Sequence, residues 1–149
     1  MTKLTKKKGT PITRYAELGG YEFRMGNKKL PITTIIFNMG AGMDCPSHAL
    51  GQCLLPHSKC YAVQAENRFR HAFGFRKRQE EQWKNCVDPW QFARHIETIN
   101  NRFGLKLFRF NESGDFWSQD CVNKLSEIAK YLKIKCGIIT YGYTARYDL

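Results

Sequence analysis

The clearest pattern in the chain is a set of three short apolar runs that are rich in β-branched and aromatic residues. Runs of this length and composition are typical of buried β-strands. A Met-Gly-Ala-Gly sequence closes the first run, which indicates a tight exit from the strand. The three runs cover residues 30–38, 104–110 and 136–141.

In three other segments, apolar residues recur at helical spacing. The first begins at Tyr61, with Gly74 as a candidate break. The second follows Asp88 and Pro89, which are typical of an N-cap and a first helical position. The third follows Ser118, a plausible N-cap. The predicted order of elements is therefore β-α-α-β-α-β.

Helical crossovers between successive strands favour parallel pairing, which places the carboxyl ends of the strands at one edge. We therefore expect an α/β fold, either an open sheet or a partial (half) barrel of mainly parallel strands, with a cysteine-rich loop after strand one. Ligand sites of parallel α/β sheets form at this edge. Exposed sheet edges must be covered, so we also expect an oligomer, a larger assembly or a fragment of a longer chain.

The composition is that of one globular domain of 149 residues, 42% hydrophobic and 25% charged. We expect a basic N-terminal segment, residues 1–29, followed by a single α/β domain, residues 30–149. No apolar run is long enough to cross a membrane, and no apolar stretch of a secretory signal follows the basic N-terminus. A cytoplasmic, reducing setting follows, in which the six cysteines are thiols or metal ligands.

The net charge of +11 is unevenly distributed. Basic residues are concentrated in residues 1–30 and again in residues 68–84, where they alternate with aromatic residues. Such a surface attracts polyanions because each neutralised phosphate releases counterions, although a solvated helix face is the alternative. We expect a nucleic acid or an acidic protein as partner. The candidate nucleic-acid-binding residues are Lys6, Lys7, Lys8, Arg76, Lys77 and Arg78.

Residues 43–62 contain three of the six cysteines and two of the four histidines, and prolines and glycine keep this segment irregular. Three thiolates on one loop can surround a metal ion or cluster and leave a fourth position open. His48 and His57 offer a zinc alternative of Cys3His or Cys2His2 type. The other interpretation is that the cysteines are small residues of the hydrophobic core. This interpretation is favoured for Cys86, Cys121 and Cys136. The candidate metal ligands are Cys45, Cys53 and Cys60.

Two further loops, residues 111–118 and 142–148, follow the second and third predicted strands. The carboxylates of Glu112 and Asp115 could bind an amine or a metal, or cap the next helix. Tyr141, Tyr143 and Arg146 could stack on a base or ring, or pack together. The candidate cofactor-binding residues are Glu112, Ser113, Gly114, Asp115, Tyr143 and Thr144.

The segments CPSHALGQCLLPHSKCYA, RFNESGDFWSQD and YGYTAR occur in this order. In combination they resemble the gene product eighty-eight-like family of phages and mobile elements. The resemblance covers roughly residues 30–147, and SGDF and CYA are its most specific parts. It implies a protein of the host cell cytoplasm, and it implies architecture more than activity.

A more distant similarity is to radical S-adenosylmethionine enzymes. These place a three-cysteine cluster loop after the first strand and a Gly-Gly-Glu-like segment after the second. Here Cys45, Cys53 and Cys60 occupy the first place and Ser113-Gly114-Asp115 the second. The wider cysteine spacing, the Asp in place of Glu and the end of the chain after three strands depart from that pattern. The similarity implies an iron–sulfur cluster more strongly than S-adenosylmethionine.

Two functional hypotheses follow. In the first, the chain is an iron–sulfur protein, a radical-enzyme-like fragment with Asp115 near the open cluster site. In the second, it is a basic binding module with a structural metal loop, which a colourless protein with one bound zinc would support. This module would engage nucleic acid or a host nucleoprotein, for example as an inhibitor of host defence. Whether the chain is an enzyme is left open.

Overall fold

The computed structural model describes residues 11–12 and 20–149. Their strands form one open sheet in the order β1-β2-β3-β4-β5. The strands are β1 Pro11–Ile12, β2 Phe23–Met25, β3 Thr34–Phe37, β4 Leu107–Phe110 and β5 Ile139–Tyr141. The helices are α1 Pro46–Ala49, the 3-10 turn η2 His57–Lys59, α2 Tyr61–Arg68, α3 Ala72–Lys84, α4 Pro89–Phe103 and α5 Gln119–Cys136. The expected mixed α/β class with an open sheet is confirmed.

The sheet has a parallel half and an antiparallel half. β3 pairs in parallel with β4, and β4 with β5, whereas β2 is antiparallel to both β1 and β3. The expectation of mainly parallel strands therefore holds only for β3, β4 and β5. Residues 26–33 between β2 and β3 are too few for a helical crossover, so this connection reverses the chain.

Residues 20–29 belong to the α/β unit rather than to a separate basic segment. Tyr21, Phe23 and Met25 are all buried in the main hydrophobic core. β2 places Phe23 and Met25 on one face of the sheet, because alternate residues of a strand share a face. The α/β unit of the described chain thus starts before residue 30.

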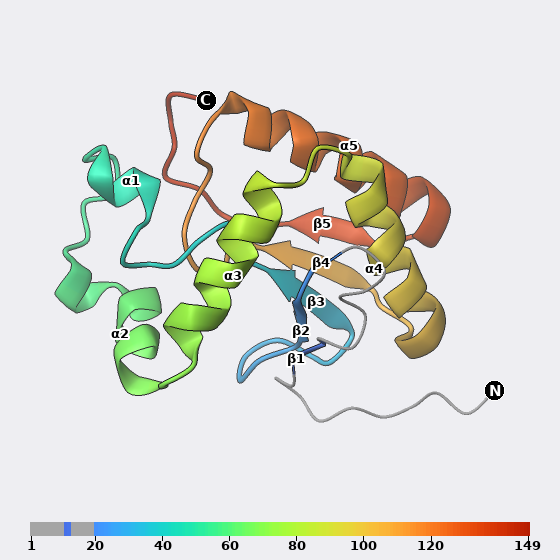
Figure 1. Cartoon of the computed structure of the whole chain (residues 1–149), viewed down its shortest axis with the longest axis horizontal. Coiled ribbons are helices and arrows are strands. Elements are labelled where there is room, and N and C mark those ends of the chain that lie inside the picture. The colour runs from blue at the N-terminus through green and yellow to red at the C-terminus, as the bar shows by residue number, and fades with distance from the viewer. Residues whose placement is uncertain (1–10, 13–19) are drawn as a thin grey trace.

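One hydrophobic core joins the sheet to the long helices. In Figure 1, α3 and α4 lie in front of the sheet, and α5 packs against α4. Phe92 of α4 is fully buried and meets Phe23, Phe37 and Trp83 edge to face or tilted, at 4.9–5.5 Å between ring centroids. Aromatic pairs at such distances add to the stabilisation from burial itself. This core fixes the strand ends that carry the candidate site.

The three predicted helix starts agree with the structure, with Tyr61 the first residue of α2, but the candidate break does not. Asp88 caps α4, its carboxylate accepting a hydrogen bond from the Trp90 backbone N–H at 2.9 Å. α5 begins after Ser118. Gly74 does not break a helix: it lies within α3, and the chain turns instead at Phe69, which is extended.

Candidate functional site

Three loops meet where β3, β4 and β5 end. α1, η2 and α2 lie beyond these carboxyl ends, on the left of Figure 1. Asp115, in the loop after β4, accepts hydrogen bonds from the Ser47 hydroxyl in the cysteine-rich segment and from Thr144 Oγ1 at 2.6 Å after β5. It also accepts from the backbone N–H groups of Ala145 at 2.9 Å and Phe116 at 2.8 Å. One carboxylate therefore ties all three loops together.

The bonding capacity of Asp115 is largely used by the protein itself. Each of its two carboxylate oxygens accepts two hydrogen bonds, and the residue is only 4% exposed. Such a buried, fully bonded carboxylate is costly to disturb. The expected contact between Asp115 and a cofactor amine would require one of these donors to leave, and it stays a prediction.

Ser113 and Gly114 pack closely against the exit from β3. The backbone N–H of Ser113 donates to Asn38 Oδ1 at 3.0 Å, and its hydroxyl donates to the Gly40 carbonyl at 3.1 Å. Gly114 has φ +75°, and a Cβ there would lie 2.8 Å from the Gly40 oxygen. A glycine is thus required both by the backbone conformation and by the close approach. These contacts give the SGD segment a structural role.

Glu112 points elsewhere. Its carboxylate accepts from Asn27 Nδ2 at 2.9 Å and lies 3.9 Å from the guanidinium of Arg76. Its backbone carbonyl accepts a hydrogen bond from the Tyr61 hydroxyl. Of the two candidate carboxylates, that of Asp115 accepts a hydrogen bond from the cysteine-rich segment, whereas Glu112 meets this segment only through its backbone carbonyl.

The three candidate metal ligands are not assembled into a ligand set. Cys45, Cys53 and Cys60 are free thiols of intermediate exposure, and Cys45 and Cys60 precede α1 and α2. Burial raises the pKa of the Cys45 thiol, and hydrogen bonds from the backbone of His48 and Ser47 oppose that rise. Within the described ranges, no three His, Cys, Asp or Glu side chains are grouped to hold a metal ion. Binding of a metal ion or cluster by these thiols stays a prediction.

The two histidines of this segment lie together. The rings of His48 and His57 stack with centroids 3.8 Å apart. The Nε2 atom of His57 is buried and has no hydrogen-bond partner. The segment that carries the three thiols thus also holds an imidazole nitrogen with no hydrogen-bond partner.

The candidate nucleic-acid-binding residues that the structure describes are bonded to other parts of the protein. Lys6, Lys7 and Lys8 lie outside the described residues. Arg76 is buried, forming an ion pair with Glu66 at 2.8 Å and donating to the Ala62 carbonyl at 2.9 Å. Its guanidinium is thus used within the protein, and phosphate contact by Arg76 stays a prediction.

Lys77 and Arg78 are also paired with carboxylates. The ammonium group of Lys77 lies 2.8 Å from the Glu80 carboxylate and 2.9 Å from the Asp44 carboxylate. The hydrogen bonds with Glu80 and Asp44 raise the pKa of Lys77. Arg78 lies 3.0 Å from Glu22. Asp44 and Glu22 come from segments that lie against α3, whereas Glu80 is three residues further along the same helix.

Exposed cations with aromatic neighbours lie just before Arg76, Lys77 and Arg78 in the sequence. We call residues Arg68, Phe69, Arg70, His71 and Phe73, between α2 and the start of α3, the basic–aromatic turn. All five are exposed, Phe69 by 60% and Phe73 by 41%. Neither Arg68 nor Arg70 pairs with a carboxylate of the described chain. The alternation of basic and aromatic residues in the sequence was the signal for this surface.

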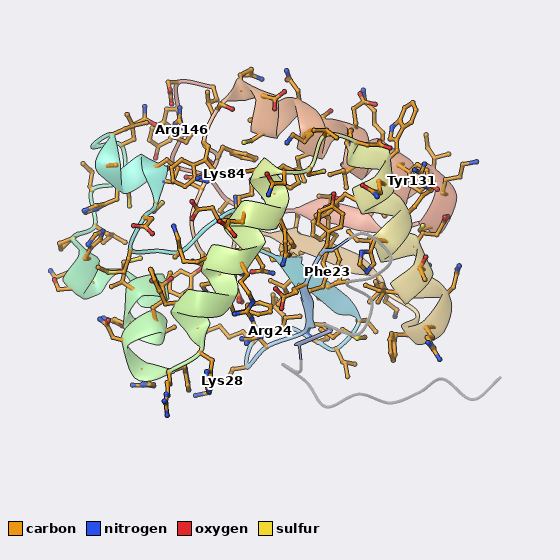
Figure 2. All side chains as sticks on the ribbon, in the orientation of Figure 1. Phe23, Arg24, Lys28, Lys84, Tyr131 and Arg146 are labelled. Carbon is orange, nitrogen blue, oxygen red and sulfur yellow. The ribbon has the colours of Figure 1, made fainter. Side chains whose placement is uncertain are left out.

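A second exposed aromatic lies at the end of β5. The guanidinium of Arg109 lies over the Tyr143 ring at 4.8 Å and the Tyr141 ring at 5.4 Å from the centroid. Tyr143 is 73% exposed. Arg146 does not join this stack. It lies near α1 in Figure 2, is 8% exposed and donates to the carbonyls of Phe116 and Trp117.

A family model described as Gene product 88 matches residues 2–149, nearly the whole chain. The chain belongs to the Gene product 88 family. No curated protein and no solved structure matched it. The family match does not bear on the similarity to radical S-adenosylmethionine enzymes, which stays a prediction.

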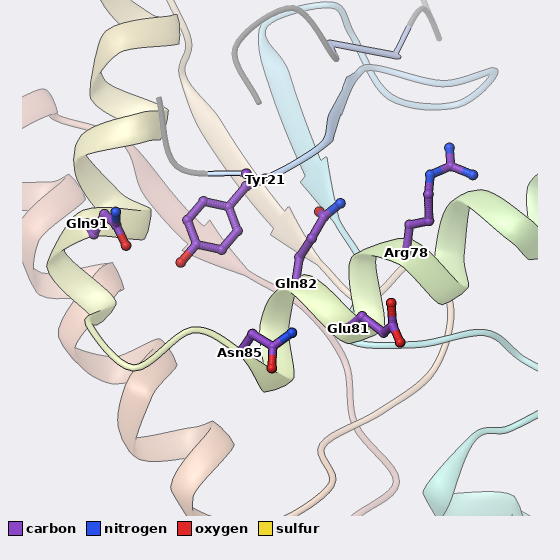
Figure 3. Close-up of a pocket in the computed structure, with 7 residues that line it drawn as sticks. Tyr21, Arg78, Glu81, Gln82, Asn85 and Gln91 are labelled. Carbon is purple, nitrogen blue, oxygen red and sulfur yellow. The ribbon is translucent and has the colours of Figure 1, made fainter. Parts of the chain in front are cut away.

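A polar cavity of about 400 Å³ in this member of the Gene product 88 family lies away from the loops. It is lined by Gly20, Tyr21, Arg78, Glu81, Gln82, Asn85 and Gln91 (Figure 3). Glu22 binds both Arg78 and Gln82 there. Burial and the neighbouring Cys86 raise the pKa of Tyr21, so its phenol stays protonated at neutral pH. This cavity holds none of the candidate metal- or cofactor-binding residues.

None of the described helices is both long enough and apolar enough to span a membrane.

Proposed function

We propose that this Gene product 88 family member binds nucleic acid through the basic–aromatic turn. The observation that carries the proposal is the pairing of unneutralised cations with exposed rings on one short turn. Arg68 and Arg70 flank Phe69, which is 60% exposed. Cations of this kind attract phosphates, and exposed rings stack on bases.

The distribution of ion pairs supports this surface over the one first expected. The protein carries a net charge of +11, yet Arg76, Lys77 and Arg78 are each matched by a carboxylate. A phosphate would have to break the buried pair of Arg76 with Glu66, which is costly, whereas the partly exposed pairs of Lys77 and Arg78 are weaker but still compete for these cations. The cations of the basic–aromatic turn have no such pair to lose.

The test is the salt dependence of binding to a labelled oligonucleotide. The double variant Arg68→Gln, Arg70→Gln should reduce the slope of log affinity against log salt by about two, one for each lost phosphate contact. Lys133→Gln with Lys135→Gln is the matched control: both lysines are exposed, on the last turn of α5, and the charge change is equal.

An unchanged slope in the arginine variant, or an equal reduction in the lysine control, would overturn the proposal. If the wild-type protein binds no nucleic acid but binds an acidic protein in a manner that requires Arg68 and Arg70, the partner class is wrong. If the natural partner is a host nucleoprotein, the wild-type protein should bind both the oligonucleotide and the acidic protein of that partner.

The cysteine-rich segment carries a second candidate function, an iron–sulfur cluster or a zinc ion on Cys45, Cys53 and Cys60. The observation in its favour is the buried, unpartnered Nε2 of His57, which lies in the same segment as the three free thiols. Since no ligand set is assembled, residues 45–60 would have to rearrange on binding, and metal affinity would then be coupled to local folding. We derive no reaction from this site.

Anaerobic metal and sulfide analysis tests this second candidate. Replacing Cys45, Cys53 or Cys60 by Ser should remove most of the bound metal, whereas the same change at Cys86, Cys121 or Cys136 should not. Iron with sulfide indicates a cluster, and zinc alone indicates a structural ion. Equal metal content in all six variants would exclude the segment as the site.

A further inference from the structure

Tyr143 has an exposed side chain on a fixed backbone. On one side, Gly142 packs so closely on Phe110 that a Cβ would lie 2.7 Å from that ring. On the other side, Thr144 and Ala145 donate to the buried carboxylate of Asp115. The backbone of Tyr143 is therefore held from both directions. Yet 73% of the residue is exposed, so burial does not account for this arrangement.

Arg109 occupies one face of the Tyr143 ring. Its guanidinium lies 4.8 Å from the centroid of that ring and 5.4 Å from that of Tyr141. Because the residue is largely exposed and one face is covered by Arg109, the opposite face of the Tyr143 ring is open to solvent. A ring held in this way loses little conformational entropy when a flat ligand stacks on it.

We propose that Tyr143 is a stacking platform for an unpaired nucleobase, and hence that the ligand of this protein is single-stranded nucleic acid. This inference rests on the nucleic-acid binding proposed above and names its ligand class. Base stacking on aromatic side chains tolerates any sequence, because every base has a π-face. In a duplex the faces of the bases are occupied by their neighbours, so a platform of this kind favours single strands.

Tyr61 connects this platform with the basic–aromatic turn. Its hydroxyl donates a hydrogen bond to the Glu112 carbonyl, and the guanidinium of Arg109 donates to the carbonyl of the adjacent Asn111 at 3.5 Å, so Arg109 lies near Tyr61 as well as Tyr143. Tyr61 is 62% exposed at the start of α2, and Arg68 is the last residue of that helix. Seven residues make about two turns, so the two side chains share a face about 10 Å apart.

The result is a track of alternating rings and cations at one side of the molecule. It runs from Tyr143 over Arg109 to Tyr61 and along α2 to Arg68 and Phe69. Alternation of this kind suits a single strand, whose backbone meets the cations while its bases meet the rings.

The decisive experiment compares three substitutions and three labelled probes. The probes are a single-stranded oligonucleotide, an abasic strand of the same length, and a duplex. Tyr143→Ala should weaken binding to the single strand about tenfold and leave binding to the abasic strand unchanged. Tyr143→Phe should bind as the wild type does, because the ring is retained. Tyr147→Ala is the matched control, since Tyr147 is 82% exposed in the same segment.

The outcomes separate the two proposals. If Tyr143→Ala binds the single strand normally while the variant lacking Arg68 and Arg70 does not, the platform is wrong and nucleic-acid binding stands. Tighter wild-type binding to the duplex than to the single strand, or an equal loss in Tyr147→Ala, also overturns the platform. If the wild-type protein binds none of the three probes, both proposals fail.

Discussion

Gly114 and Gly137 both have φ angles in the left-handed region, +75° and +66°, yet their surroundings differ. A Cβ on Gly114 would lie 2.8 Å from the Gly40 carbonyl oxygen, whereas one on Gly137 would meet nothing within 4 Å. We expect Gly137→Ala to lower the free energy of unfolding by about 1 kcal/mol through backbone strain alone. Gly114→Ala must also push apart the loops after β3 and β4, and should cost about 1 kcal/mol more.

Urea denaturation of the two variants beside the wild type measures this difference. Equal losses would mean that the contact between Gly114 and Gly40 contributes nothing to stability. A larger loss in Gly137→Ala would contradict the close packing of the two loops.

At the level of residues, the sequence indicated where the loops meet but not how their polar groups are used. The SGD segment was a candidate for a cofactor because it follows the second predicted strand and is similar to the Gly-Gly-Glu-like segment of radical enzymes. Its donors come from Ser47, Thr144 and Ala145, which are 68, 29 and 30 residues away. Only the fold brings these donors to Asp115. The same limit applied to Arg76, whose partner Glu66 becomes apparent only when α2 and α3 pack together.

Among the elements, α4 and α5 provide a matched pair of helix starts. The Asp88 carboxylate accepts from the Trp90 N–H at 2.9 Å, whereas the Ser118 side chain makes no capping hydrogen bond. Asp88→Ala should therefore lower the free energy of unfolding by about 1 kcal/mol. Ser118→Ala should change it by less than about 0.5 kcal/mol. Thermal unfolding followed by circular dichroism tests both, and an equal loss in the two variants would contradict the capping assignment.

Elements with a strong apolar stripe were predictable, and short or interrupted ones were not. β2 has three residues with Arg24 at its centre, so its alternation of Phe23 and Met25 is too short to stand out. Gly74 suggested a helix break, but α3 continues through it because Phe75, Gln79 and Trp83 are buried on one side of that helix. Tertiary packing here outweighs the low helix propensity of glycine.

For the whole molecule, the mixed α/β class and the parallel pairing of β3, β4 and β5 follow from the long helical connections between these strands. The antiparallel half could not be inferred in the same way, because its connection is short and carries no helical pattern. Net charge indicated a polyanionic partner but not its place. The place depends on which cations are already paired within the fold.

Acid should destabilise the whole fold through its core. His95 of α4 is 2% exposed and lies edge-on to Phe23 at 5.3 Å. Burial lowers its pKa from the ordinary 6.5 to about 4. The folded state therefore binds this proton less readily than the unfolded state. The contribution is fully present above pH 6.5 and is lost as the pH falls from 6.5 toward 4, by at most about 3 kcal/mol.

The variant His95→Phe isolates this effect, because it keeps an aromatic ring in the core and removes the titrating group. We expect the free energy of unfolding of the wild type, measured in urea at pH 7, 6, 5 and 4.5, to fall more steeply than that of the variant. The difference between the two proteins should grow by up to about 1.4 kcal/mol for each pH unit below 6.5. Parallel pH profiles would show that His95 takes up its proton equally well in the folded and unfolded chains, and the acid sensitivity of the core would then have to come from another group.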